Sequence, residues 1–244
     1  MSQLSQVPQI DVLYEDNAFI VVNKPAGITS IPDGFHPDDP DLVAVLEPAL
    51  GKLWIVHRLD KDTSGAIIFA RDEETHRTLS LQFEARDVSK AYHALVHGTP
   101  DWAERTVNAP LRVNADRQHR TLVDHTIGKP ATTNFRVLEK YRRFALLEAQ
   151  PETGRTHQIR VHAKFLGLPI VCDGVYGDPK PLVLSQIKPG YRSSAHEERP
   201  LIDRLALHAF QLEVTHPQTQ ERMSFEAPYP KDLRAAVNQL GKLS

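Results

Sequence analysis

The sequence predicts an α+β fold, with a mixed, mainly antiparallel β-sheet and a few helices. Short apolar runs rich in β-branched residues outnumber amphipathic helical runs along the chain. Neighbouring runs are joined by short turn-forming segments, and a chain of 244 residues with 41% hydrophobic residues can bury a substantial core. No Pro/Gly/Ser-rich linker divides the middle, so we expect a tail over residues 1–9 and a single domain over 10–244.

The first half of the chain predicts a hairpin, two central strands and two helices. Residues 10–14 and 19–22 are strand-like and flank the turn-forming triplet at 15–17. A short helix is expected over 41–50. The apolar runs at 54–56 and 66–70 indicate two buried strands. Residues 73–86 are typical of an amphipathic helix, and 88–96 of a strand that carries Tyr92.

The second half predicts more strands and a proline-rich excursion. Residues 98–130 are expected to be irregular, 132–138 and 144–149 to be paired strands, and 156–166 to be a helix with a cationic face formed by His157, Arg160 and Lys164. Residues 178–204 contain four prolines and little periodicity, which favours a long mobile loop. Strands at 205–214 and 223–225 and a closing helix marked by Leu233 and Leu240 follow.

Charge is unevenly distributed along the chain. The formal net charge is −2, yet residues 105–165 contain twelve Lys and Arg against five Asp and Glu. A basic segment in an acidic chain can be an electrostatic footprint for phosphates. It can equally be a solvated charged face.

Several classes of protein are excluded or disfavoured. The chain has no glycine-rich phosphate-binding loop, no metal-ligand cluster and no nucleophile elbow. His157 and His162 are five positions apart and do not share a helix face or a strand face, so no metal is expected. The single Cys172 rules out an intramolecular disulfide. With no signal peptide and no long apolar run, we expect a cytoplasmic protein that has no contact with membranes.

A polar loop between the two central strands is the best candidate for chemistry. Residues 57–65 read His-Arg-Leu-Asp-Lys-Asp-Thr-Ser-Gly, with Asp60 at the centre. Two buried strands would hold such a loop rigidly. From the residues alone, an Asx-type turn at Asp60 or Asp62 is the more ordinary interpretation.

The loop resembles the H-R-L-D-x-x-T-S-G signature of the RluA family of pseudouridine synthases. The resemblance covers about residues 10–229, and N-K-P-x-G at 23–27 also resembles the family. Lys24 in that stretch either reaches toward substrate or is a surface lysine before a proline turn. Four further motifs carry the likeness, at residues 90–94, 128–131, 153–162 and 205–209.

The resemblance implies an enzyme that isomerises uridine in ribosomal or transfer RNA, without a cofactor. It implies a monomer with a central active-site cleft, and here the small N-terminal RNA-binding domain of many relatives is expected to be absent. By match to the motifs, Asp60 is the catalytic carboxylate, acting as nucleophile or as base. Tyr92 would stack on the uracil, and Arg160 would pair with Asp60. The substrate-binding candidates are His57, Arg58, Thr63, Arg155, His157 and Leu207.

Two other functions remain open at this point. A non-catalytic RNA-binding module of the same fold would explain the basic segment but not a rigidly held aspartate. A glycoside hydrolase would use Asp60 and Asp62, although such enzymes need two carboxyl groups about 5 to 9.5 Å apart across a sugar. Neighbours at i and i+2 in a turn seldom face each other in that way.

Overall fold

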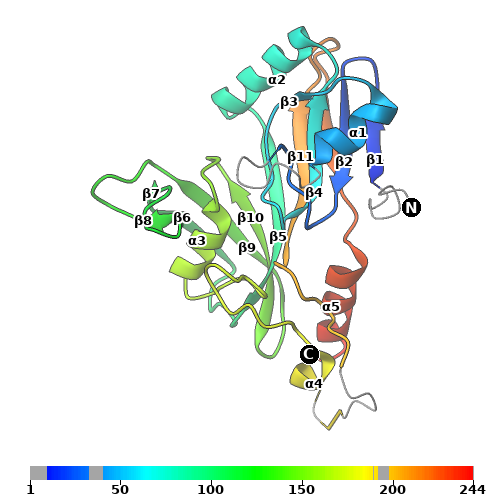
Figure 1. Cartoon of the computed structure of the whole chain (residues 1–244). Coiled ribbons are helices and arrows are strands. Elements are labelled where there is room, and N and C mark those ends of the chain that lie inside the picture. Colours follow the sequence, from blue (N-terminus) through cyan, green and yellow to red (C-terminus); the bar gives the residue numbers. More distant parts are fainter. Residues whose placement is uncertain (1–9, 33–40, 189, 192–197, 244) are drawn as a thin grey trace. The chain divides into compact units, whose positions relative to one another are not determined.

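The computed structural model describes residues 10–32, 41–188, 190–191 and 198–243, and the chain forms two compact units. The first contains the described residues of Met1–Lys90 and Ala209–Pro228, and the second those of Ala91–His208 and Tyr229–Ser244 (Figure 1). The predicted fold class, α+β with a mixed, mainly antiparallel sheet, is confirmed. A single domain over residues 10–244 and a central cleft stay predictions.

The first unit is a sheet whose neighbouring strands are β1, β2, β4 and β11, with β3 also paired to β4 and β12 to β11. The predicted opening hairpin is confirmed, because β1 and β2 pair antiparallel. All seven residues of β4 are buried, as expected of a central strand. The strand bounds are Asp11–Glu15 (β1), Phe19–Lys24 (β2), Trp54–Ile55 (β3), Ser64–Ala70 (β4), Leu207–Thr215 (β11) and Arg222–Glu226 (β12).

In the described part of the first unit there are two helices, and each is capped by the aspartate that precedes it. Asp41 precedes α1 (Leu42–Leu50), and its carboxylate accepts hydrogen bonds from the next helical N–H groups at 2.9 and 3.1 Å. Asp72 caps α2 (Glu73–Ala85) in the same way, and Arg86 ends it in a left-handed conformation with φ 61°. Both helices were predicted, α2 from its apolar spacing.

The second unit contains strands in the order β5, β10, β9 and β6, and a separate ribbon of β7 and β8. The interpretation of residues 98–130 as wholly irregular was wrong, because β6 pairs antiparallel with β9. Val107 is the only buried residue of β6, so this strand has no alternating apolar pattern to reveal it. The strand bounds are Ser89–His97 (β5), Glu104–Asn108 (β6), Leu111–Arg112 (β7), Leu122–Val123 (β8), Thr132–Lys140 (β9) and Phe144–Pro151 (β10).

Among the residues of the second unit that the structure describes, the helices are α3 (Gln158–Phe165), α4 (Leu184–Ile187) and α5 (Lys231–Gly241). The predicted closing helix is α5, with Leu233 and Leu240 buried. The expected start of α3 was two residues too early. His157 has φ 55° and is the N-cap, so the regular helix begins at Gln158.

The described part of the 178–204 segment is tied to the core at both sides. Leu182 and Ile202 are buried and form an isolated bridge, and α4 follows Val183. Residues 189 and 192–197 lie outside the described residues, and the mobility of the segment stays a prediction.

Nearby, burial raises the pKa of the Cys172 thiol to about 11, and the thiol donates to the Lys180 carbonyl at 3.3 Å.

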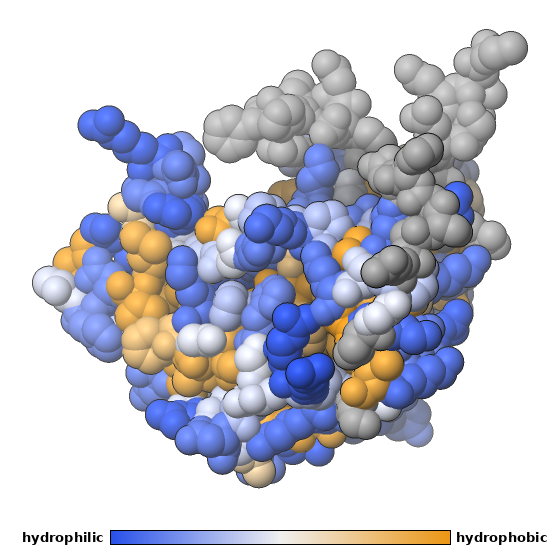
Figure 2. Space-filling model, turned by 90° about the horizontal axis from the view of Figure 1, so that it is seen from below, coloured by the Kyte–Doolittle hydropathy of each residue, from blue (hydrophilic) through white to orange (hydrophobic). Residues whose placement is uncertain are grey.

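The face seen from below in Figure 2 is a mixture of hydrophilic and hydrophobic residues. Figure 2 shows blue hydrophilic residues interspersed with orange hydrophobic areas on the face seen from below. Across the ranges that the structure describes, every helix is too short or too polar to cross a bilayer.

Candidate active site

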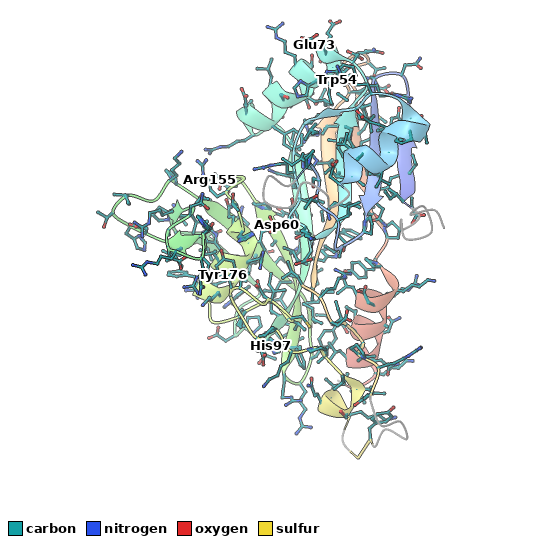
Figure 3. All side chains as sticks on the ribbon, viewed as in Figure 1. Trp54, Asp60, Glu73, His97, Arg155 and Tyr176 are labelled. Atoms are coloured by element: carbon teal, nitrogen blue, oxygen red, sulfur yellow. The ribbon has the colours of Figure 1, made fainter. Side chains whose placement is uncertain are left out.

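The loop between β3 and β4 holds Asp60, which is half-buried (Figure 3). Its predecessor Leu59 is buried, and both the N–H and the carbonyl of Leu59 bond to the Ser30 hydroxyl at 3.0 Å. Ser30 is itself 3% exposed. The backbone on one side of Asp60 is therefore fixed by a side chain nearly thirty residues earlier.

Lys24 fixes the backbone on the other side of Asp60. Its side chain is fully buried, and its ammonium donates to the carbonyls of Ile28 at 2.7 Å, Pro25 at 2.9 Å and Lys61 at 2.9 Å. The Lys61 carbonyl also accepts from the Gly27 N–H at 2.9 Å. The expectation of a surface lysine is wrong, and these contacts show Lys24 joining the 24–28 turn to the loop.

The end of the loop requires its glycine. Gly65 has φ 120°, and a Cβ added there would lie 2.2 Å from the Ala209 carbonyl oxygen. Only glycine tolerates both the conformation and the close backbone approach. The bend before it is closed by the Asp60 carbonyl, which accepts from the Thr63 N–H at 3.1 Å. Thr63 is 2% exposed.

His57 and Arg58 differ in environment. The His57 ring stacks on Phe83 of α2, with centroids 4.7 Å apart, and its Nε2 accepts from the Ile68 N–H at 3.3 Å. Burial, assisted by the nearby charge of Lys90, lowers the pKa of His57 to about 3. His57 is therefore a neutral support of the loop at physiological pH, whereas Arg58 is exposed.

Tyr92 and Leu207 belong to the second unit. Tyr92 lies on β5 opposite Ala149 of β10, is half-buried and packs against the core of this unit. Leu207 begins β11 and is 3% exposed. The strand that the sequence predicted for Tyr92 is confirmed, and its role stays a prediction.

Arg160 is buried, so the predicted cationic face of α3 is wrong in its central member. The guanidinium pairs with Asp173, with Nε to Oδ2 at 2.9 Å and Nη2 to Oδ1 at 2.8 Å. His157 is half-buried, and Lys164 alone of the three is exposed. Asp173 was not singled out from the sequence, although a carboxylate directly after the apolar run 170–172 is a signal of a buried partner.

Several polar residues of the 153–162 motif build the scaffold. The Gln158 side chain accepts from the Thr153 hydroxyl at 2.6 Å and the Arg155 N–H at 3.1 Å, and donates to the Thr132 carbonyl at 2.9 Å. The His162 ring contacts the Ala109 carbonyl at 3.0 Å and is fully buried. Arg155, labelled in Figure 3, is half-buried, and its Nε also donates to the Pro130 carbonyl at 3.4 Å.

A pocket of about 250 Å³ also lies in the second unit, but it contains none of the predicted catalytic residues. It is lined by three cations, Arg142, Arg143 and Lys188, together with residues of α4 and α5. Arg142 and Arg143 are exposed at the turn between β9 and β10. The predicted pair of strands with cations at its end is confirmed.

Comparison with known proteins shows the family. The family described as RNA pseudouridylate synthase matches residues 18–165, which include the Asp60 loop, Tyr92 and Arg160. A Vibrio cholerae protein named ribosomal large subunit pseudouridine synthase C is 35% identical over 98% of this chain and 72% of its own length. A Pseudomonas aeruginosa protein named ribosomal large subunit pseudouridine synthase D is 39% identical over 94% of this chain and 71% of its own.

Solved structures agree with the sequence relatives. Human RNA pseudouridylate synthase domain containing 4 has a TM-score of 0.73 and 26% identity, covering 94% of this chain and 92% of its own. Human RNA pseudouridylate synthase domain containing 1 has a TM-score of 0.71 and 29% identity, covering 91% and 84%. The chain therefore belongs to the RNA pseudouridylate synthase family, and the resemblance to its RluA members is confirmed. It is an isomerase that acts on RNA and converts uridine into pseudouridine.

Proposed function

We propose that this enzyme isomerises a uridine of large-subunit ribosomal RNA, with Asp60 as the catalytic carboxylate. The choice of RNA is supported by the two bacterial relatives named for the large ribosomal subunit. The choice of Asp60 is carried by one observation: its neighbours Leu59 and Lys61 are hydrogen-bonded to the buried side chains of Ser30 and Lys24, respectively. A carboxylate in such a loop is preorganised for chemistry.

The reaction needs no external reactant. The glycosidic bond between N1 and the ribose breaks, the uracil turns in the site, and C5 bonds to the same ribose carbon. C5 then loses its proton and N1 gains one, so atoms and charge balance. Asp60 starts this sequence either as a nucleophile or as a base at the sugar. In both routes the carboxylate carries the reaction, and we assign Arg160 as its cationic partner in the assembled site.

The remaining residues hold the RNA in this proposal. Tyr92 stacks on the flipped uracil, which returns part of the few kcal/mol that unstacking costs. Arg58 and Arg155 contact the RNA, with Thr63, His157 and Leu207 at the substrate. Since His57 is neutral and packed against α2, we assign it to the support of Arg58 and not to phosphate binding. We further propose a monomer that works in the cytoplasm.

Mapping pseudouridines in a strain that lacks the gene tests the target. We expect one or more positions of large-subunit RNA to lose pseudouridine and to regain it with the wild-type gene but not with Asp60→Asn. In vitro, tritium release from C5-labelled RNA should fall more than about tenfold, a change of 1.4 kcal/mol in the barrier, while RNA affinity stays. Loss of pseudouridine from transfer RNA alone would refute the ribosomal target. Normal turnover by Asp60→Asn would remove Asp60 from the reaction.

A further inference from the structure

Arg160 is held by a carboxylate that no motif assigned. Asp173 presents both oxygens to one edge of the guanidinium, at 2.9 Å from Nε and 2.8 Å from Nη2. Two parallel charged hydrogen bonds fix the plane of a guanidinium as well as its position.

Asp173 is itself held in place by its own turn. Its Oδ1 also accepts from the backbone N–H of Val175 at 2.9 Å and of Tyr176 at 3.0 Å. Its carbonyl accepts from the Gly177 N–H at 2.9 Å. Burial favours the protonated acid, but the hydrogen bonds and charge of Arg160 and the two N–H groups outweigh it and lower the pKa of Asp173. The carboxylate is therefore ionised and immobile at neutral pH.

Tyr176 fixes the guanidinium from a second direction. The Arg160 guanidinium carbon lies 5.1 Å from the centre of the Tyr176 ring, a cation–π contact. The Tyr176 hydroxyl is 2.9 Å from both the Thr121 N–H and His157 Nδ1. Asp173 thus sets the orientation of Arg160 in its plane, and an anchored aromatic ring limits movement out of that plane.

The burial of this pair is not explained by stability alone. Asp173 is fully buried and Arg160 is 7% exposed. Removing two charges from water is costly, so a buried ion pair is weak evidence of a stabilising contact. The two hydrogen bonds from Asp173 and the ring of Tyr176 instead fix the orientation of the Arg160 guanidinium.

We infer that Asp173 is a positioning residue of the enzyme, which orients the Arg160 guanidinium for the role that Arg160 has in the proposed function. Asp173 acts through Arg160 and does not itself meet the substrate. This inference rests on the proposed role of Arg160.

Asp173→Asn tests the inference, with Asp232→Asn as a matched control. Asp232 makes the same fork with Arg204, at 2.7 and 2.8 Å, in the first turn of α5 and outside the proposed site. The substrate is a C5-tritiated transcript that carries the mapped uridine. We expect Asp173→Asn to lower the single-turnover rate about tenfold or more, with the RNA Kd within about twofold and the protein still folded at the assay temperature. The control should keep its rate.

A double-mutant cycle with Arg160→Lys shows whether Asp173 acts through Arg160. Losses that are much less than additive support the inference, because a displaced arginine and a lysine lack the same interaction. Additive losses, or a normal rate in Asp173→Asn, overturn it. If Asp173→Asn does not fold, Asp173→Ser carries the same test, since serine keeps an acceptor for the turn but cannot form the fork.

The cycle also separates this inference from the proposed function. A normal rate in Arg160→Lys refutes the proposed role of Arg160. An impaired Arg160→Lys beside a normal Asp173→Asn refutes only the positioning role of Asp173.

Discussion

Replacing Lys24 by methionine tests how firmly the catalytic loop must be held. Methionine keeps most of the apolar stem but removes the ammonium that donates to three carbonyls. An unsatisfied buried acceptor costs about 1–3 kcal/mol, and the change also removes the cost of burying an ammonium. We expect a net loss of about 3 kcal/mol in the free energy of unfolding. For a chain of this size that lowers Tm by about 6–12 °C.

Activity should fall by more than the loss of stability explains. At 25 °C the variant remains folded, but the Lys61 carbonyl beside Asp60 has lost the Lys24 ammonium and keeps the Gly27 N–H as donor. A displacement of about 1 Å at a reacting group can cost about a hundredfold in rate. We expect a single-turnover rate at least about tenfold below wild type, measured by tritium release, with Tm followed by circular dichroism. Lys52→Met, at an exposed lysine beside Trp54, is the control. A Tm within 2 °C of wild type, where ~1 kcal/mol would be visible, together with a normal rate would refute the anchoring role.

Three further predictions concern the Asp60 loop and the stacking of the target uracil. Gly65→Ala should prevent stable folding, seen as loss of soluble protein or a large drop in Tm, because its Cβ would meet the Ala209 carbonyl at 2.2 Å. Tyr92→Ala should weaken RNA binding by about 1–3 kcal/mol in a filter-binding assay while Tyr92→Phe does not, if stacking is its role; equal effects would contradict stacking. The folded-state pKa of His57 lies below its ordinary value of 6.5, so protonation favours unfolding, and stability is lost as pH falls from 6.5 toward about 3. His57→Gln should flatten the fall of Tm with pH in that range, and an unchanged slope would contradict this.

Local patterns in the sequence account for most of the fold. The strand at 66–70 and the hairpin at 10–22 were predicted because apolar runs and turn residues carry their own signal. The edge strand β6 was missed because its exposed residues do not alternate. The local sequence does not indicate which distant strands pair with each other, so the strand order of the sheet could be read only from the structure.

In the candidate active site, too, the sequence predicted some residues and only the structure revealed others. Asp60 was predicted because the motif at residues 57–65 can be recognised in the sequence itself. The groups that hold the loop are buried polar side chains far away in the chain, and Lys24 lies thirty-seven residues from its acceptor Lys61. A lysine before a proline is typical of a surface turn, so only burial revealed its function. Asp173 was missed for a similar reason, since its partner Arg160 precedes it by thirteen residues.

The chemistry of the only cysteine offers a route to spectroscopy of this enzyme. Cys172 is 6% exposed, and with a pKa of about 11 its thiol is almost entirely protonated near neutral pH. Very little of it is thiolate, the form that reacts with maleimides. Cysteines introduced at exposed positions can therefore be labelled with fluorophores or spin labels while the native residue is left in place. The distance between two such labels would report conformational change when the protein binds RNA.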